Sequence, residues 1–178
     1  MEKKTIFDLN RCDIAGFKSM PKLPLRLVLD NIRSLNNIGS MFRTSDAFLV
    51  ERIHLCGITA TPPSVEIHKT ALGAEDSVDW SYHATTMDAV EELRREGYTV
   101  CALEQVKESI PLDEYEVRPD AKYAIVVGHE VDGVDPQVVN ACQAAIEIPQ
   151  MGTKHSLNVA VSAGLALWTF FSALRRYH

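Results

Sequence analysis

The sequence contains no run of about 18 apolar residues, the length that a membrane-spanning helix requires. Its first residues, Met1-Glu-Lys-Lys, do not lead into the apolar core of a secretion signal. The cysteines are scattered without a C-x-x-C pair, and no histidine stands at the ligand spacing of a zinc site. These absences argue against a membrane, secreted, disulfide-stabilised or zinc-binding protein, so we expect a cytoplasmic protein without a metal.

Common nucleotide-binding signatures are also missing. Residues 128–133, GHEVDG, do not form G-x-G-x-x-G, and no Gly-Lys-Ser/Thr follows them. This argues against dinucleotide-dependent dehydrogenases and P-loop NTPases. The negative charge of Glu130 makes the loop poorly suited to binding phosphate. A ligand with a positive centre, or one that hydrogen-bonds to the backbone, suits the loop better.

The chain has no excess of positive charge: its net charge is −6, a mild argument against a nucleic-acid partner. The charge is unevenly distributed, because residues 1–52 carry nine Lys and Arg against six acids, a net of +3, which leaves −9 for the rest. A basic amino-terminal third is compatible with a phosphate-facing surface and equally with an ordinary solvated one.

What the sequence does contain is a regular alternation of strand and helix patterns over a length that suits one domain. Strand patterns cover residues 25–30, 52–56, 81–83, 98–103, 123–127 and 145–148. Helix patterns cover residues 40–48, 65–72, 86–96, 136–142 and 156–175, with loops over 31–39 and 104–119. The alternation predicts an α/β domain with a mainly parallel sheet and helices on both faces.

The last predicted helix is apolar nearly all round, with Val161, Leu165, Trp168 and Phe171 spread over more than one face. A helix with two apolar faces needs two partners. One is the sheet. A second copy of the chain is the favoured other partner, which predicts a homodimer, and a helix enclosed within a monomer is the alternative.

Two strand-to-loop junctions carry glycine and polar residues: 125–133 and 148–159. They lie about twenty residues apart, which is typical of neighbouring loops around one pocket at the carboxyl edge of a sheet.

Three segments together resemble the SpoU (TrmH-like) branch of the SPOUT methyltransferases. They are Asn37-Ile-Gly39-Ser-Met-Phe-Arg43, then Val127-Gly128-His-Glu130-Val-Asp-Gly133, then Ile148-Pro149-Gln-Met151-Gly152 with Ser156-Leu157-Asn158-Val159. The resemblance spans residues 25–176, and the order and spacing of the segments agree. It implies S-adenosylmethionine-dependent methyl transfer to a ribose 2′-hydroxyl in tRNA or rRNA, a carboxyl-terminal trefoil knot, and a site completed across a dimer.

The resemblance also implies which residues bind the cofactor: Leu103, Gly128, Ile148, Met151, Gly152, Ser156 and Leu157. Glycine at position 128 would let the ligand approach the main chain closely, although a plain tight turn explains it too. Core packing is the alternative for Ile148 and Leu157.

Catalytic or site-organising roles fall by resemblance on Asn37, Arg43, Glu130, Ser156 and Asn158. A ribose hydroxyl is a very weak acid, so its proton must be removed or the alkoxide stabilised. Arg43 acts either as a base or as a cation that anchors phosphate and stabilises the alkoxide; the second is favoured because guanidinium stays protonated, and a surface arginine is the structural alternative.

Asn37, Glu130 and Asn158 are each compatible with more than one role. Asn37 orients Arg43, touches RNA or is only a turn residue. Glu130 either accepts backbone N–H bonds or fixes Arg43 across the interface, and Asn158 is either part of the site or a helix cap. His129 and His155 match no required position of the family and are interpreted as bystanders.

The domain prediction is a basic extension over residues 1–24 and a SPOUT methyltransferase domain over 25–178. Because residues 1–24 are too few for an RNA-binding domain, the chain resembles minimal family members, which favours tRNA over rRNA as substrate.

The family commonly has Ser after Asn-Val in the third motif, whereas Ala160 follows Val159 here. A non-catalytic knotted RNA-binding protein is therefore the second hypothesis.

Overall fold

The structure is a computed structural model that describes residues 1–5, 8 and 11–177. Its centre is one sheet in the order β3-β2-β1-β6-β4-β7-β5, in which every pairing is parallel. The strands are β1 (Leu23–Asp30), β2 (Val50–Cys56), β3 (Trp80–His83), β4 (Tyr98–Leu103), β5 (Ile110–Pro111), β6 (Lys122–Val127) and β7 (Ala144–Glu147).

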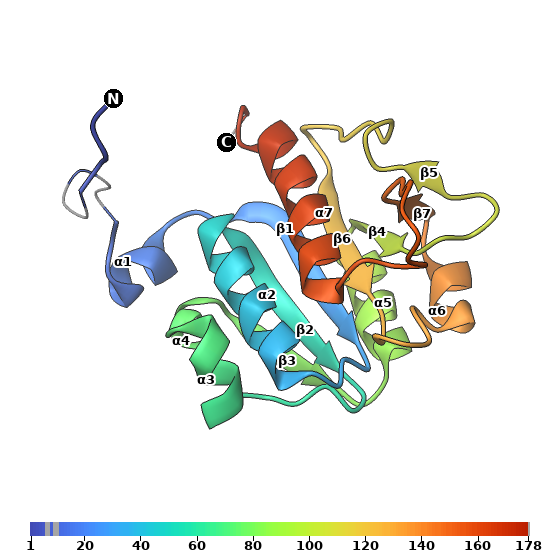
Figure 1. The fold of residues 1–178 in the computed structure, drawn as a ribbon, viewed down its shortest axis with the longest axis horizontal. Coiled ribbons are helices and arrows are strands. Elements are labelled where there is room, and N and C mark those ends of the chain that lie inside the picture. The colour runs from blue at the N-terminus through green and yellow to red at the C-terminus, as the bar shows by residue number, and fades with distance from the viewer. Residues whose placement is uncertain (6–7, 9–10, 178) are drawn as a thin grey trace.

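Helices cover both faces of the sheet (Figure 1), which confirms the predicted α/β architecture. One face packs against α2 (Leu35–Ala47), α3 (Val65–Ala71), α4 (Ala74–Ser77) and α7 (Val159–Leu174), and α1 (Ile14–Ser19) lies beside α4. The other face packs against α5 (Thr86–Arg95) and α6 (Pro136–Ala141).

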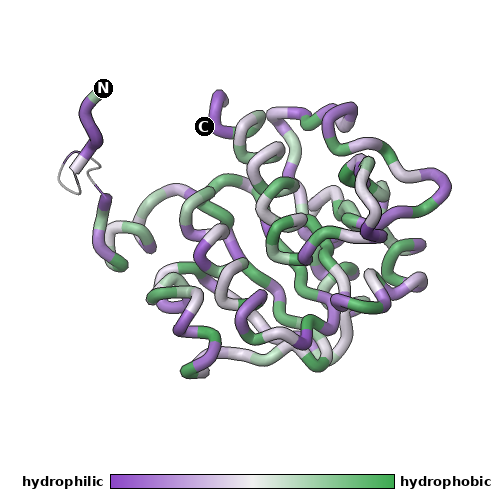
Figure 2. The backbone as a smooth tube through the Cα atoms, in the orientation of Figure 1, coloured by the Kyte–Doolittle hydropathy of each residue, from purple (hydrophilic) through white to green (hydrophobic). Residues whose placement is uncertain are grey.

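Alternation along the strands supplies both core layers. In β1, Leu27 and Leu29 join the core under α2 and α7, whereas Val28 between them joins the core under α5 and α6. Figure 2 shows that apolar residues follow the central strands and α7. Within the described part of the chain, no helix combines the length and hydropathy that a membrane crossing requires.

The start of α2 differs from the prediction. The helix begins at Leu35 rather than Ser40, because the Ser34 hydroxyl accepts the N–H of Asn37 as a helix cap. Asn37 and Gly39 therefore lie in a helix and not in a loop. Gly39 allows close packing of α2 on α3, since a Cβ there would lie 2.3 Å from the carbonyl oxygen of Ile67.

Two other boundaries also differ. The predicted loop 104–119 contains the short strand β5, which pairs with β7 at the edge of the sheet. The last helix begins at Val159 and not at Ser156, because Asn158 caps it. Ser156 and Leu157 consequently lie in the loop that precedes α7.

The trefoil knot stays a prediction. The loop after β4 lies next to β7 and the loop after it: the Gln105 amide donates to the carbonyl of His155 over 3.5 Å, and Leu112 N–H donates to the carbonyl of Glu147 over 2.7 Å.

Candidate active site

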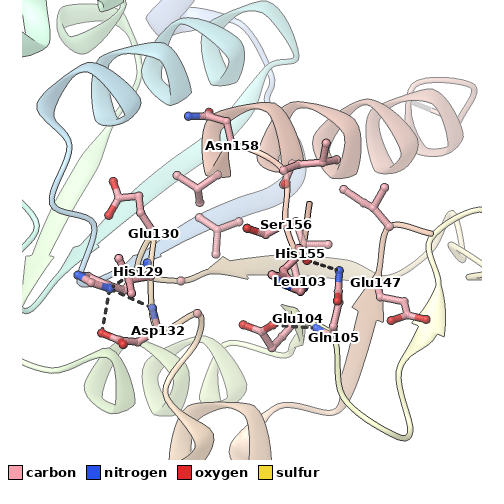
Figure 3. Close-up of a pocket in the computed structure, with 18 of the residues that line it drawn as sticks. Leu103, Glu104, Gln105, His129, Glu130, Asp132, Glu147, His155, Ser156 and Asn158 are labelled. Atoms are coloured by element: carbon pink, nitrogen blue, oxygen red, sulfur yellow. Dashed lines mark hydrogen bonds and ion pairs between the residues drawn. The ribbon is translucent and has the colours of Figure 1, made fainter. Parts of the chain in front are cut away.

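A cavity of about 570 Å³ opens at the carboxyl ends of β4, β6 and β7 (Figure 3). Its walls are the loops that follow these strands and the segment that enters α7. The predicted site residues that line it are Leu103, Gly128, Glu130, Ile148, Ser156, Leu157 and Asn158. Residues separated widely in the sequence therefore meet at one edge of the sheet, as expected for parallel strands.

The loop after β6 folds back on itself. His129 and Gly133 each donate a backbone N–H to the other's carbonyl, over 3.0 and 2.9 Å. A Cβ at Gly128 would lie 2.1 Å from the main chain of Gly133 and Val134. Glycine at 128 is thus required by this tight turn, and the turn presents its backbone to the cavity.

Glu130 connects this loop to the start of α2. One carboxylate oxygen accepts the backbone N–H of Arg33 (3.1 Å), and the other accepts that of Ser34 (3.0 Å) and the side-chain amide of Asn37 (3.0 Å). Burial alone would raise the pKa of Glu130, but these donors together hold its pKa below the ordinary value. Of the two sequence-based alternatives, the geometry shows acceptance of backbone N–H groups, here from residues 33 and 34.

Asn37 and Asn158 extend the same network. The Asn158 amide donates to the Asn37 side-chain oxygen over 3.1 Å, while its own oxygen accepts the N–H groups of Ala160 and Val161. Asn158 is therefore a helix cap and also a contact between α7 and α2. Both ends of the Asn37 side chain are used by Glu130 and Asn158, so it is not placed to orient Arg43 within the chain.

The cavity wall is rich in acidic side chains: Glu104, Glu130, Asp132 and Glu147 all line it. Glu104 accepts the N–H groups of Gln105 (2.9 Å) and Val134 (2.8 Å) and so fixes two wall segments. Carboxylates in a concave site favour a ligand with a positive centre. The family motifs do not include Glu104 or Glu147. Their positions give a signal nevertheless, because Glu104 directly follows β4 and Glu147 ends β7.

The side chain of His129 also lines the cavity. Its Nδ1 lies 3.3 and 3.2 Å from the N–H groups of Val131 and Asp132 and 3.0 Å from the Asp132 carboxylate. His155 contributes to the wall through its backbone contact with Gln105. Both residues interpreted as bystanders thus lie in the cavity wall.

Four predicted site residues do not line this cavity: Asn37, which contacts its rim through Glu130 and Asn158, and Arg43, Met151 and Gly152. Arg43 is exposed and lines a second cavity of about 790 Å³, together with Arg11, Phe17 and Asp46. Met151 is fully exposed and borders an adjoining hollow, and a Cβ at Gly152 would meet nothing within 4 Å. In a single chain, therefore, Arg43 lines a different cavity from the one lined by Gly128, Glu130 and Asn158.

The comparison with protein families agrees with this geometry. The model for the SpoU rRNA methylase family matches residues 24–168, most of the chain. The chain belongs to the SpoU rRNA methylase family. The resemblance seen in three short motifs is thereby confirmed over the whole sheet and most of α7.

Individual relatives within the SpoU family differ in length. A 23S rRNA (guanosine-2′-O-)-methyltransferase RlmB of Nitrosomonas europaea is 32% identical over 83% of this chain, which covers 55% of that protein. An AdoMet-bound rRNA methyltransferase from Sinorhizobium meliloti is 27% identical with a TM-score of 0.78, over 86% of this chain and 57% of its own. The chain thus spans little more than half the length of these two relatives.

A third SpoU-fold relative is similar in size. A structure described as giving insight into the 2-OH methylation of C/U34 on tRNA is 27% identical, with a TM-score of 0.74, over 85% of this chain and 97% of its own.

Proposed function

We propose that this chain is an S-adenosylmethionine-dependent RNA methyltransferase that transfers a methyl group to a ribose 2′-hydroxyl, with tRNA favoured over rRNA. The observation that carries the proposal is the hydrogen-bonded contact of the three family motifs, Asn37, Glu130 and Asn158, at the rim of an acidic cavity.

The cavity suits the cofactor. Its loops would hold S-adenosylmethionine through the backbone around Gly128, Ile148 and Leu157, and its carboxylates complement the positive charge of the sulfonium and amino groups. When bound, the cofactor supplies an electrophilic methyl group. Met151 and Gly152, which do not line the cavity, would contribute only if the loop that contains them closed over the ligand.

Arg43 has a different task. In the proposed enzyme, Arg43 of one chain reaches the cavity of a second chain, because the two features are separate within one chain. Its guanidinium would anchor an RNA phosphate and stabilise the alkoxide that forms as the 2′-hydroxyl attacks the methyl group. The favoured role is thus electrostatic rather than that of a base.

The homodimer would form through α7. Val161, Leu165 and Trp168 on this helix remain 52%, 43% and 49% exposed, although the rest of the helix packs on the sheet. A surface of this kind is typical of an interface between subunits. The proposed dimer covers these side chains and joins the two halves of the site.

The choice of tRNA rests on size. The structure described with tRNA is matched over 97% of its own length, whereas the two rRNA-modifying relatives above are matched over little more than half of theirs. Residues 1–24 are proposed as a basic extension and residues 25–178 as the methyltransferase domain, and the protein is proposed to work in the cytoplasm.

Arg11 and Arg43 would provide phosphate contacts, so RNA binding should weaken as the salt concentration rises.

The test is methyl transfer from radiolabelled S-adenosylmethionine to total tRNA and, separately, to rRNA, both from cells that lack the protein. Nuclease digestion then identifies the labelled nucleotide. The expected result is a 2′-O-methyl nucleotide in tRNA. Label in rRNA alone would correct the substrate, and no label in either RNA from a cofactor-binding protein would refute the enzymatic assignment in favour of RNA binding without turnover.

A further inference from the structure

A cluster of polar side chains, none of which lines the cavity, lies where helix α5 contacts strands β2 and β3 at one edge of the sheet. Figure 1 shows where these three elements lie in the fold. His54 comes from β2, Ser81 and His83 from β3, and Glu92 from α5. His54 pairs with Ser81 in the parallel register, and His83 follows two residues later, so these side chains share one face of the sheet. The proposed methyltransferase reaction uses none of them.

The nitrogen and oxygen atoms of the cluster converge on one point. His54 Nδ1 and His83 Nε2 are 2.9 Å apart, and Ser81 Oγ lies 3.2 Å from each. One donor atom from each of His54, His83 and Glu92 lies within 4.8 Å of the other two. In a tetrahedral zinc site with ligand bonds of about 2.1 Å, neighbouring donor atoms are about 3.4 Å apart. The two histidine nitrogens are closer than this value, and the Glu92 oxygen lies within 4.8 Å of a ring nitrogen of each histidine, so side-chain shifts of at most about 1.4 Å would complete such a site.

The surroundings of the cluster also suit a metal. Neutral imidazole is a common zinc ligand, and His54 Nδ1 and His83 Nε2 face each other at the centre of the cluster. Within the described residues, no hydrogen bond or ion pair engages the Glu92 carboxylate. The carboxylate is therefore available to bind the ion and to neutralise part of its charge. His83 and Glu92 are half-buried, which leaves the ion a route from solvent.

We propose that His54, His83 and Glu92 bind a divalent transition-metal ion of the zinc type, with water completing its coordination. The bound ion would tie the edge strand β3 and helix α5 to β2. This departs from the sequence-based expectation of no metal, which considered only ligands close together in the chain; here they come from three elements.

The expected affinity is moderate. A metal-ligating histidine usually donates its second ring N–H to an acceptor, and loss of that partner typically weakens binding ten- to a hundredfold. His54 Nε2 is buried without a hydrogen-bond partner among the described residues. We therefore expect a Kd in the micromolar range rather than the nanomolar range.

The test is a titration of the chelator-treated full chain with ZnCl₂ by calorimetry, with the melting temperature measured in parallel. One ion should bind per chain, and saturating Zn²⁺ should raise Tm by roughly 5 °C, because a ligand of the native state stabilises it. His83→Gln and Glu92→Gln should each weaken binding at least tenfold. Both side chains are half-buried, so these variants should fold.

Two matched controls separate this site from adventitious binding. Glu91→Gln alters the neighbouring exposed carboxylate on α5, and His68→Gln alters an exposed histidine that contacts Glu75. Both should bind Zn²⁺ like the original chain. The proposal is overturned if the chain binds no Zn²⁺ at about 100 µM, a concentration well above the expected Kd. Binding that survives both His83→Gln and Glu92→Gln, or that disappears with His68→Gln, would also overturn it.

Discussion

The side-chain amide of Asn158 donates to the side-chain oxygen of Asn37 over 3.1 Å, although the two residues are 121 positions apart. Asn37 in turn donates to Glu130, which accepts the backbone N–H groups of Arg33 and Ser34. One residue from each of the three family motifs therefore belongs to a single hydrogen-bonded chain, and that chain fixes the entry to α7 relative to α2 and the loop after β6.

Replacing Asn37 with Ala should break this chain at its centre. Glu130 loses its side-chain donor and Asn158 loses its acceptor, so we expect a loss of about 1–2 kcal/mol in the free energy of unfolding. Methyl transfer should fall at least tenfold, because loops that position a reaction lose rate steeply when they shift. Urea denaturation and single-turnover transfer measure the two effects.

Asn36→Ala is the matched control, since Asn36 precedes Asn37 in α2 and its side chain is exposed. It should change stability by less than about 0.5 kcal/mol and leave transfer intact. Equal effects of the two substitutions would show that the Asn37 contacts contribute nothing beyond helix propensity.

The sequence was sufficient for the layered architecture but not for all element boundaries. Alternating helix and strand patterns correctly predicted six strands, because buried parallel strands are apolar runs bounded by turn residues. The start of α2 was predicted five residues late, since Gly39 resembled a loop residue. Glycine stands at position 39 for a reason of tertiary packing: the carbonyl of Ile67, 28 positions later, leaves no room for a Cβ.

The candidate site was predictable where it follows strand ends. Gly128 and Ile148 come directly after β6 and β7, and parallel strands bring their carboxyl ends together. The position of Arg43 was not predictable in this way, because local spacing does not reveal that α2 directs it to another cavity. The convergence of His54, His83 and Glu92 was missed for the same reason.

The separation of Arg43 from the cavity leads to a prediction about mixed dimers. Arg43→Ala alone should abolish transfer and change cofactor affinity by no more than a few-fold, since Arg43 does not line the cavity. Leu157→Arg should block the cofactor cavity and abolish transfer as well. If each site takes its cavity from one chain and Arg43 from the other, a heterodimer of the two variants contains one intact site.

Equimolar mixing after reversible dissociation should therefore restore about a quarter of the original activity, because half of the dimers are mixed and each has one working site. Arg95→Ala, an exposed arginine on the opposite helix layer, should retain full activity in the same assay. No recovery in mixtures whose subunits demonstrably exchange would contradict assembly of the site from two chains.

The exposed apolar face of α7 makes the dimer itself testable. Leu165→Glu places a charge on this face, and burying an unpaired carboxylate is costly. We expect light scattering at micromolar concentration to show a dimer for the original chain and a monomer for this variant. The monomer should also lose methyl transfer, because Arg43 would no longer reach a cavity.

The control for surface charge is Val65→Glu on α3, where the original valine is 75% exposed. This variant should remain dimeric and active. A monomeric original chain, or a dimer that is unaffected by Leu165→Glu, would remove α7 as the interface.

The buried histidine in β2 predicts a specific pH dependence of stability. Because the pKa of His54 falls from 6.5 to about 3 on folding, the unfolded chain binds a proton between these values and the folded chain does not. The contribution of neutral His54 is complete above pH 6.5 and is lost as the pH falls. Between pH 7 and 5 the original chain should lose about 2 kcal/mol of unfolding free energy through this group.

Urea denaturation at pH 7, 6 and 5, with a chelator present, would measure this loss. His54→Gln removes the titrating group while it keeps a neutral polar side chain, so its stability should depend less on pH by the same amount. His68→Gln should retain the original slope, because His68 is exposed. The same slope in all three proteins would mean that folding does not lower the pKa of His54.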